Sequence, residues 1–288
     1  MKACPNCATT FDGLWFCPRC NFAPKTIEGF LSFAPDLASE TSQLHPTDFA
    51  TLAAIENQNF WFRSRNRLIG WAIQRYFERP AKILEIGCGT GFVLSEIRRI
   101  FPVTELSGSE ASCAGLAFAA QRVKSASLFQ MDARNIPFRE EFDVVGAFDV
   151  LEHIREDERV LSQMHAALRP GGGIVVTVPQ HAFLWSPVDE VAGHVRRYSA
   201  RELIEKVSRA GFHVTRATSF VSLLLPLMIA SRLGRRNSSG KAVAESEFVL
   251  GPVGDFLLER LFDVERGLIR MGLSFPVGGS MLIVARKH

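Results

Sequence analysis

The chain has 288 residues, of which 47% are hydrophobic and 22% charged, and its formal net charge is +3. This composition is ordinary for a soluble globular protein, and the length is sufficient to bury a large core. The charge is too small to indicate nucleic-acid binding on its own, and no apolar run reaches the ~20 residues of a membrane-spanning helix.

Residues 1–24 contain four of the six cysteines, arranged as Cys4-Pro-Asn-Cys7 and Cys17-Pro-Arg-Cys20. Two-residue spacing lets each pair of thiolates converge on one tetrahedral metal, and four thiolates close the coordination sphere. The pattern therefore predicts a structural zinc knuckle, with iron less favoured. Clustered cysteines without a secretory leader pattern indicate a reducing compartment, so we expect a cytoplasmic protein. Three roles stay open for the knuckle: gripping RNA, contacting a partner, or bracing the rest of the chain.

Residues 25–45 have the mixed, proline- and serine-containing composition of a linker. Apolar residues at three- and four-residue steps then predict a helix from about Asp48 to Phe77, which Pro80 ends. From there strands and helices alternate, which is typical of a mostly parallel sheet covered on both faces. Strands are expected at 82–86, 103–107, 142–148, 174–178, 213–218 and 281–285, and helices at 92–100, 112–123, 156–168 and 201–209.

The C-terminal part departs from this alternation. Residues 222–272 have a helical pattern with apolar residues on one face, and we expect them to form an insertion before the last strand. The predicted organisation is a core at 46–221, a helical cap at 222–276, and a terminal strand of the core sheet at 277–288.

The strongest local signal is the segment Ile83-Leu84-Glu85-Ile86-Gly87-Cys88-Gly89-Thr90-Gly91. A buried strand runs into three glycines, and in open α/β sheets ligands bind in the crevice beyond the carboxyl end of such a strand. The dinucleotide fingerprint needs its third glycine one residue later, where Phe92 stands, and no Gly-Lys-Ser/Thr phosphate loop follows. Glu85 suits a ligand with a cationic amino group better than a pyrophosphate, because like charges repel.

Two further acids follow at the ends of predicted strands. Glu110 closes the second strand about 20 residues after the loop, where a carboxylate accepts hydrogen bonds from ribose hydroxyls. Asp132, in Gln130-Met131-Asp132-Ala133, follows the third strand position and suits the exocyclic amine of adenine. With three acids around the loop, cofactor binding is favoured over a mere tight turn.

At these residues the sequence resembles the class I S-adenosylmethionine (SAM)-dependent methyltransferases, over roughly residues 55–215 and the terminal strand. The acid-x-Gly-x-Gly-x-Gly motif of that family is matched in full by Glu85, Gly87, Gly89 and Gly91. The segment Phe142–His153 is similar to the family's fourth-strand motif. The turn Leu168-Arg169-Pro170-Gly171-Gly172-Gly173 is similar to the one before its fifth strand.

The resemblance implies a Rossmann-like fold with a seven-stranded, mostly parallel sheet. It implies a SAM-dependent methyltransferase whose acceptor is a small molecule, such as a glycan, a lipid or a quinone-like compound. The residues expected to hold SAM are Glu85, Gly87, Cys88, Gly89, Gly91, Glu110, Asp132, Ala133 and Phe148. Just past the fourth strand, Glu152 and His153 either line the site or form a satisfied hydrogen-bonding pair. Nothing in the pattern indicates an oligomeric state.

Two histidines are candidates for a general base. His194 begins a His-x-Arg-Arg-Tyr segment similar to one found in many small-molecule members of the family. An imidazole is suited to this role because its unperturbed pKa is about 6.5. His181, in the loop that leaves the fifth strand, is the weaker candidate.

The rest of that segment provides candidate acceptor-binding residues, namely Arg196, Arg197 and Tyr198. An arginine there would hold a carboxylate or a phosphate through two parallel hydrogen bonds. The equally favoured alternative is a solvated basic turn in which one arginine pairs with Asp189 or Glu190.

Two other segments suit the surroundings of such a site. Asn57–Arg67 combines aromatic residues with three arginines, and the family often folds such a segment over the cofactor. A lid or core helix is favoured there over a nucleic-acid stripe. The apolar run Phe220–Leu233 is predicted to line a hydrophobic acceptor pocket, with a peripheral membrane contact as the alternative.

Two other functions stay open. The first is an RNA methyltransferase that reads RNA with the knuckle, since known rRNA guanine methyltransferases combine a four-cysteine module with this fold. The segment Asn/Asp-Pro-Pro-Tyr/Phe, typical of base-amine methylation, is missing, because Asp149-Val150-Leu151-Glu152 stands there, so nucleic acid is not favoured. The second is a non-catalytic binding module, against which the three intact acids argue.

Overall fold

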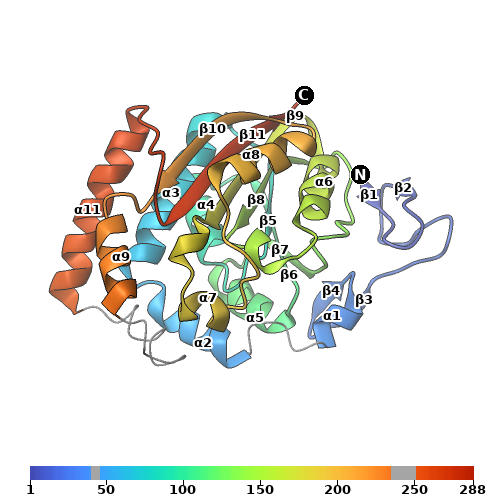
Figure 1. Ribbon diagram of the computed structural model, residues 1–288. Helices are drawn as coiled ribbons and strands as arrows, with labels where there is room; N and C mark the ends of the chain where they lie inside the picture. Colours follow the sequence, from blue (N-terminus) through green and yellow to red (C-terminus); the bar gives the residue numbers. More distant parts are fainter. Residues whose placement is uncertain (40–45, 235–250) are drawn as a thin grey trace.

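A nine-stranded sheet organises the part of the chain that the structure, a computed structural model, describes: residues 1–39, 46–234 and 251–288 (Figure 1). The strand order is β10-β11-β9-β8-β5-β6-β7-β4-β3. Strands β4 to β9 run parallel to one another, whereas β3 pairs antiparallel with β4, and β11 pairs antiparallel with both β9 and β10. Their bounds are β3 Lys25–Ile27, β4 Phe30–Ser32, β5 Lys82–Ile86, β6 Glu105–Glu110, β7 Ser127–Gln130, β8 Phe142–Phe148, β9 Leu168–Pro179, β10 Phe212–Phe220 and β11 Ser280–Lys287. Strands β5 to β11 form the expected seven-stranded Rossmann-like sheet, so the predicted fold class is confirmed.

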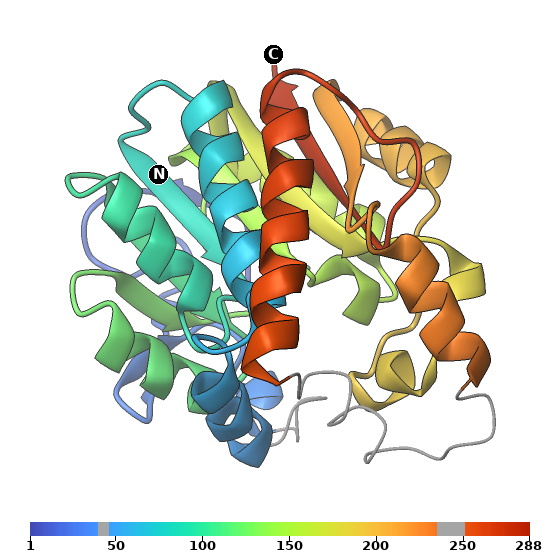
Figure 2. The same cartoon turned by 90° about the vertical axis from the view of Figure 1, so that its left-hand side faces the viewer.

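Helices cover both faces of this sheet because the central strands are apolar on both sides; in β8, for example, five consecutive residues from Val144 to Phe148 are buried. One face packs against α3, α4, α5 and α11, and Figure 2 shows α3 and α11 side by side on it. The opposite face packs against α6 and α8. The helices are α1 Pro35–Ser39, α2 Pro46–Ile55, α3 Phe60–Tyr76, α4 Phe92–Ile100, α5 Cys113–Arg122, α6 Asp157–Ala167, α7 Pro187–Val191, α8 Ala200–Arg209, α9 Leu225–Gly234 and α11 Pro252–Arg270, with short 3₁₀ helices η1 Leu151–His153 and η2 Ala182–Leu184.

The N-terminal part contributes more structure than expected. Strands β1 (Lys2–Ala3) and β2 (Thr10–Phe11) form a separate two-stranded sheet in the cysteine module. In the segment expected to be a linker, β3 and β4 form a hairpin, and β4 extends the main sheet by pairing with β7. The segment therefore belongs to the edge of the core sheet over residues 25–32.

Three predicted elements differ most from the observed ones. The single helix expected from Asp48 to Phe77 is two helices, because Asn59 has an extended backbone and its side chain caps α3 by accepting from the amide of Trp61. Strand β6 begins two residues later than expected, and Val103 is 95% exposed. The glycine run after Leu168 lies within β9, with an irregular register against β8, and is not a separate turn.

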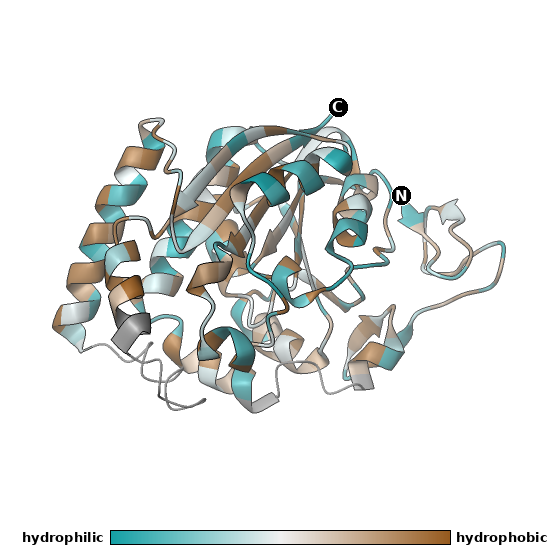
Figure 3. Cartoon of the chain, in the orientation of Figure 1, coloured by the Kyte–Doolittle hydropathy of each residue, from teal (hydrophilic) through white to brown (hydrophobic). Residues whose placement is uncertain are grey.

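The predicted helical insertion is represented by α9 and α11, and residues 235–250 of that prediction lie outside the described residues. Hydrophobic and hydrophilic positions alternate along α11 (Figure 3). Several of its apolar residues are more than half exposed, namely Val253, Phe256, Leu257 and Val264. Phe262 and Ile269 on the other side of α11 are buried against the core. Among the described helices, none combines the length and the apolar character that crossing a bilayer requires.

Gly91, at the start of α4, is expected to tolerate no side chain. Its φ is +75°, and an added Cβ would lie 2.9 Å from the Cα of Ala119 in α5. We expect Gly91→Ala to lower the free energy of unfolding by about 2–5 kcal/mol, because a left-handed backbone and a backbone clash add together. Gly171 has a similar φ of +77° with nothing within 4 Å of its added Cβ, so Gly171→Ala should cost only about 1–2 kcal/mol. Equal losses in urea unfolding would contradict this account.

Candidate functional site

A cavity of about 640 Å³ lies at the carboxyl ends of β5, β6, β7 and β8. This edge of the sheet collects the loops that follow successive parallel strands, which is where ligands bind in open α/β folds. Eight of the nine residues expected to hold a cofactor line this cavity, namely Glu85, Gly87, Cys88, Gly89, Glu110, Asp132, Ala133 and Phe148. The ninth, Gly91, packs against Ala119 behind the loop.

The glycine loop and Glu110 form one hydrogen-bonded unit. The carboxylate of Glu110 accepts from the amide of Gly89 at 3.0 Å and from its own neighbour Ala111 at 2.8 Å. Burial raises the pKa of Glu110, and these amide donors oppose that shift. The loop itself has positive φ at Gly87 and Gly89, which only glycine adopts readily. A carboxylate held in this way at the strand end can accept hydrogen bonds from the hydroxyls of a ribose.

Glu85 is the residue of the cavity best suited to face a cationic group. The side chain is buried, and its Oε2 atom has no hydrogen-bond partner among the described residues. Burial raises the pKa of Glu85 well above its usual range, although the charge of Arg65 opposes the shift. A buried carboxylate oxygen without a partner is costly, so a cationic amino group placed beside it would be bound favourably. The amino group of SAM has that charge, and these residues therefore fit the cofactor.

Asp132 borders the cavity next to the glycine loop. Its Oδ1 accepts from the backbone amide of Arg134 at 2.8 Å and from the guanidinium Nε at 3.0 Å. Arg134 also lies 3.4 Å from Glu156, so this side of the cavity is rimmed by paired charges. The second carboxylate oxygen of Asp132 shares the guanidinium.

Helix α2 closes the cavity above the glycine loop. Phe49 and Leu52 line its wall, and Glu56 fixes the end of the helix. The carboxylate of Glu56 accepts from the hydroxyl of Thr90 at 2.6 Å and pairs with Arg122 at 2.7 Å. The cavity is therefore bounded by apolar side chains on one side and by the polar strand ends on the other.

Arg65 is a site residue that the sequence pattern did not single out. It lines the cavity, stacks over Trp61 at 4.6 Å, and forms an ion pair with Asp149. Asp149 has a φ of +58° directly after β8, and Thr177 donates to its other oxygen at 3.2 Å. The aromatic and basic segment 57–67 thus covers the cavity, as a lid or core helix would. The other two arginines of that segment, Arg63 and Arg67, pair instead with Glu259 of α11.

His194 is held by an acid but lies behind the cavity wall. Its Nδ1 is 2.8 Å from Oδ1 of Asp189, which also accepts from Nε of Arg197 at 2.7 Å. His194 is not among the cavity residues, whereas its neighbours Val195 and His153 are. The rings of His194 and His153 contact each other edge to face, with centroids 4.8 Å apart.

The other candidates after β9 are engaged within the protein. Tyr198 is fully buried and donates to Asp157 at 2.6 Å, and Arg196 pairs with the same carboxylate at 2.6 Å. Arg197 pairs with Asp189, as in the alternative of a structural turn, but its side chain is only 6% exposed and so is not solvated. His181 stacks on Phe183, and its Nε2 is buried without a partner among the described residues.

Asp189 is expected to make the stability of this region depend on pH. Burial raises the pKa of Asp189, but hydrogen bonds from His194 and Arg197 outweigh it and hold the pKa at about 2, below the ordinary 3.8. The carboxylate therefore stabilises the folded state fully above about pH 4, and this contribution is lost as the pH falls through 2. We expect Asp189→Asn to lower the unfolding free energy by about 3 kcal/mol at pH 7, since it breaks a buried ion pair.

Urea unfolding of the wild type and Asp189→Asn between pH 7 and pH 2 measures the effect. The difference between their free energies of unfolding should decrease as the pH falls from 4 towards 2. Glu190→Gln changes the formal charge by the same amount at an exposed neighbour and should cost little. A constant difference at every pH would contradict the assigned pKa.

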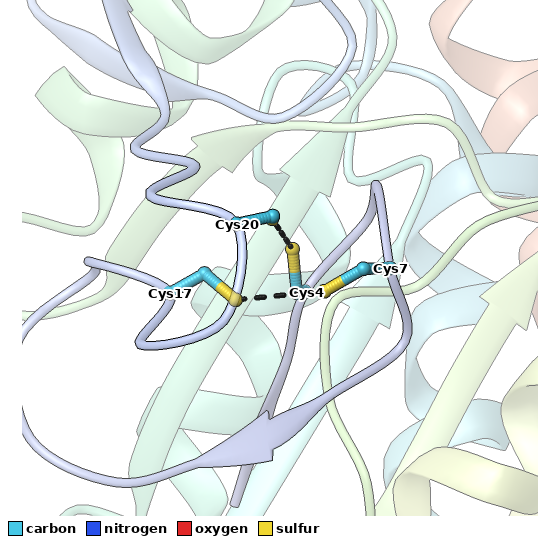
Figure 4. Close-up of side chains that lie close together, drawn as sticks. All are labelled: Cys4, Cys7, Cys17 and Cys20. Atoms are coloured by element: carbon cyan, nitrogen blue, oxygen red, sulfur yellow. Dashed lines mark hydrogen bonds between the residues drawn. The ribbon is translucent and has the colours of Figure 1, made fainter.

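The four N-terminal cysteines gather at one point (Figure 4). The sulfur of Cys4 lies 3.4 Å from that of Cys20, and the sulfur of Cys7 lies 3.6 Å from that of Cys17. Four thiolates around one tetrahedral metal with ~2.3 Å bonds would lie about 3.8 Å apart, so the group fits a metal ion.

The cysteine module packs onto the core beyond Asp132. The amide of Ala3 donates to the carbonyl of Pro137 at 3.0 Å, and Lys2 forms a bridge with Phe138. The ring of Trp15 lies tilted against that of Phe33, with centroids 4.4 Å apart, and also contacts Phe138. Of the three roles left open for the module, these contacts support bracing of the core.

A family profile described as a methyltransferase domain matches residues 54–217. A probable SAM-dependent methyltransferase of Mycolicibacterium smegmatis is 29% identical over 182 residues, 60% of this chain and 67% of that protein. A ubiquinone biosynthesis O-methyltransferase of Rhodopseudomonas palustris is 33% identical over 116 residues, which cover 35% of this chain and less than half (45%) of that protein. The solved structure of Haemonchus contortus phosphoethanolamine N-methyltransferase 2 with SAM shares the fold, with a TM-score of 0.57, 20% identity, and coverage of 90% of this chain and 60% of that one.

Proposed function

Because the chain belongs to the methyltransferase-domain family and is a SAM-dependent methyltransferase, we propose that its acceptor is a small molecule, such as a glycan, a lipid or a quinone-like compound. The observation that carries this proposal is the covered cavity. Phe49 and Leu52 of α2 and Phe62 of α3 form its apolar wall above the glycine loop. An acceptor has to enter this space to reach the methyl group, which favours a compact molecule with an apolar part.

The cofactor is proposed to lie along the strand ends. Glu85 would face its amino group, Glu110 its ribose, and Asp132 its adenine, with Gly87 and Gly89 providing bare backbone for close approach. When bound, the sulfonium of SAM supplies the electrophilic methyl group and most of the activation. The protein then has to align the acceptor and exclude water, which positioned residues around a partly covered cavity can do.

A base is needed only where the acceptor atom carries a proton. We propose His194 for this role, with His181 as the second candidate, because Asp189 fixes the orientation of the His194 ring. Arg196, Arg197 and Tyr198 are proposed to bind the acceptor, which is possible in two ways. Either these side chains leave Asp157 and Asp189, or they act on the acceptor indirectly through those two carboxylates. The cysteine module is proposed to bind a structural zinc ion in a reducing, cytoplasmic setting.

Incubation with methyl-labelled SAM tests the acceptor class. Purified, zinc-loaded protein would be incubated separately with the small-molecule fraction, the lipid fraction and the RNA of a bacterial extract. We expect label in the small-molecule or lipid fraction, and none when Glu110→Ala replaces the wild type. Label transferred to RNA alone would overturn the proposal and favour the RNA methyltransferase alternative.

A further inference from the structure

A second cluster of metal-ligating side chains lies beside the cavity. Among the described residues, two groups have the required side chains close together: the four cysteines, and Glu152 with His153 and His194. One ligand atom from each of these last three lies within 4.8 Å of the others. Glu152 and His153 come from η1, after β8, and His194 comes from the segment after β9. The amide of Val195 donates to the carbonyl of Glu152 at 2.8 Å and joins the two segments.

Glu152 is the observation that points to a ligand. Its side chain is 0% exposed, and neither carboxylate oxygen has a hydrogen-bond partner among the described residues. The Nε2 atom of His194 lies 3.9 Å from Oε1 of Glu152, which is beyond hydrogen-bonding distance. A fully buried carboxyl group with two orphaned oxygens is rare, and a cation between it and the histidines would satisfy both.

His194 is already oriented as metal ligands usually are. Its Nδ1 is bound by Asp189, which leaves Nε2 directed towards Glu152. Such an outer partner fixes the tautomer and the ring orientation of a metal-binding histidine. The ring of His153 lies against that of His194, with centroids 4.8 Å apart. The set of two imidazoles and one carboxylate leaves coordination positions open.

We propose that Glu152, His153 and His194 bind a divalent transition-metal ion at the wall of the cavity. The open positions would face the cavity, because His153 and Val195 line it. The site itself is independent of the acceptor class, whereas its catalytic use rests on the proposed function and would replace the role of His194 as a general base, because an Nε2 atom bound to the ion cannot take up a proton. An acceptor hydroxyl bound to the ion would lose its proton more readily, with the proton passing to solvent. The oxygen lone pair would then form the C–O bond as the C–S bond breaks and its electron pair remains on sulfur.

Zinc binding tests the site without relying on activity. Metal-free protein would be dialysed against Zn²⁺ with a weak chelator that removes surface-bound ions, and the bound zinc measured by atomic emission. We expect two zinc ions per chain in the wild type and one in Glu152→Gln and in His194→Gln. His165→Gln is the matched control, because His165 is also a half-buried histidine but lies outside the cluster. It should retain two.

Binding of S-adenosylhomocysteine by the same variants shows that they are folded, and His153→Gln, at the cavity surface, is the further variant if Glu152→Gln does not fold. One zinc ion per chain in the wild type would overturn the metal site, as would two ions in all cluster variants. Loss of S-adenosylhomocysteine binding with two zinc ions retained would instead count against the proposed cofactor site.

Discussion

Replacement of Glu110 by alanine should weaken the binding of S-adenosylhomocysteine roughly hundredfold, because hydrogen bonds to a buried charged group contribute about 1.5–3 kcal/mol each. The carboxylate of Glu110 accepts a hydrogen bond from the amide of Gly89 and is proposed to accept hydrogen bonds from the ribose hydroxyls. Its loss removes the partner of the ribose and also releases the glycine loop. Calorimetric titration of zinc-loaded protein measures the change directly.

Glu105→Ala is the control for this measurement. Glu105 begins the same strand β6 at its other end, its side chain is 73% exposed, and it pairs with Lys82 at 3.2 Å. The two variants therefore remove the same chemical group from the two ends of one strand. We expect wild-type affinity for Glu105→Ala, and equal affinity of all three proteins would refute the assignment of Glu110 to the cofactor.

Replacement of Cys17 by serine should abolish metal binding by the N-terminal module and also weaken the cofactor site. Cys17 is fully buried, and the module is too small to fold around a core of its own, so metal ligation supplies its folding energy. Without the module, the contacts of Ala3 and Trp15 with the loop after Asp132 are lost. We expect S-adenosylhomocysteine affinity to fall about 5- to 10-fold, the low end of the range for coupled sites.

Zinc content, proteolysis of residues 1–24 and calorimetric titration together test this expectation. Cys113→Ser is the control, because Cys113 is a buried cysteine of α5 that is separate from the module. It should retain its zinc and a protected N-terminus. An unchanged cofactor affinity in Cys17→Ser, despite loss of the metal, would show that the module does not brace the site.

The residues that could be predicted are those whose signal is local. The glycine loop, its flanking acid and the paired cysteines each need only a short spacing to be recognised, and the structure brings Glu85, Glu110 and Asp132 to one cavity. The ion pair between Arg65 and Asp149 joins residues 84 positions apart, so no short pattern reports it. The approach of His194 to Glu152 depends in the same way on how two segments distant in the sequence meet.

The differences between the predicted and the observed strands also have physical causes. The predicted bounds of β6 begin two residues too early because Val103 is a residue typical of strands, whereas the observed strand contains small residues. A side chain at Gly108 would clash with Leu94 at 2.5 Å, so close helix packing selects against the apolar residues that mark most strands. The hairpin of β3 and β4 was missed because three-residue strands carry too little pattern to be distinguished from a linker.

The attachment of α2 to the glycine loop has a consequence for how long a ligand stays in the cavity. The carboxylate of Glu56 at the end of α2 binds Thr90 and Arg122, so this one group attaches α2 to the glycine loop. A ligand beneath Phe49 leaves more freely when this attachment opens, although the cavity also has an open side. Its residence time would then depend on how often the attachment opens, and a slowly released product would limit the rate of turnover.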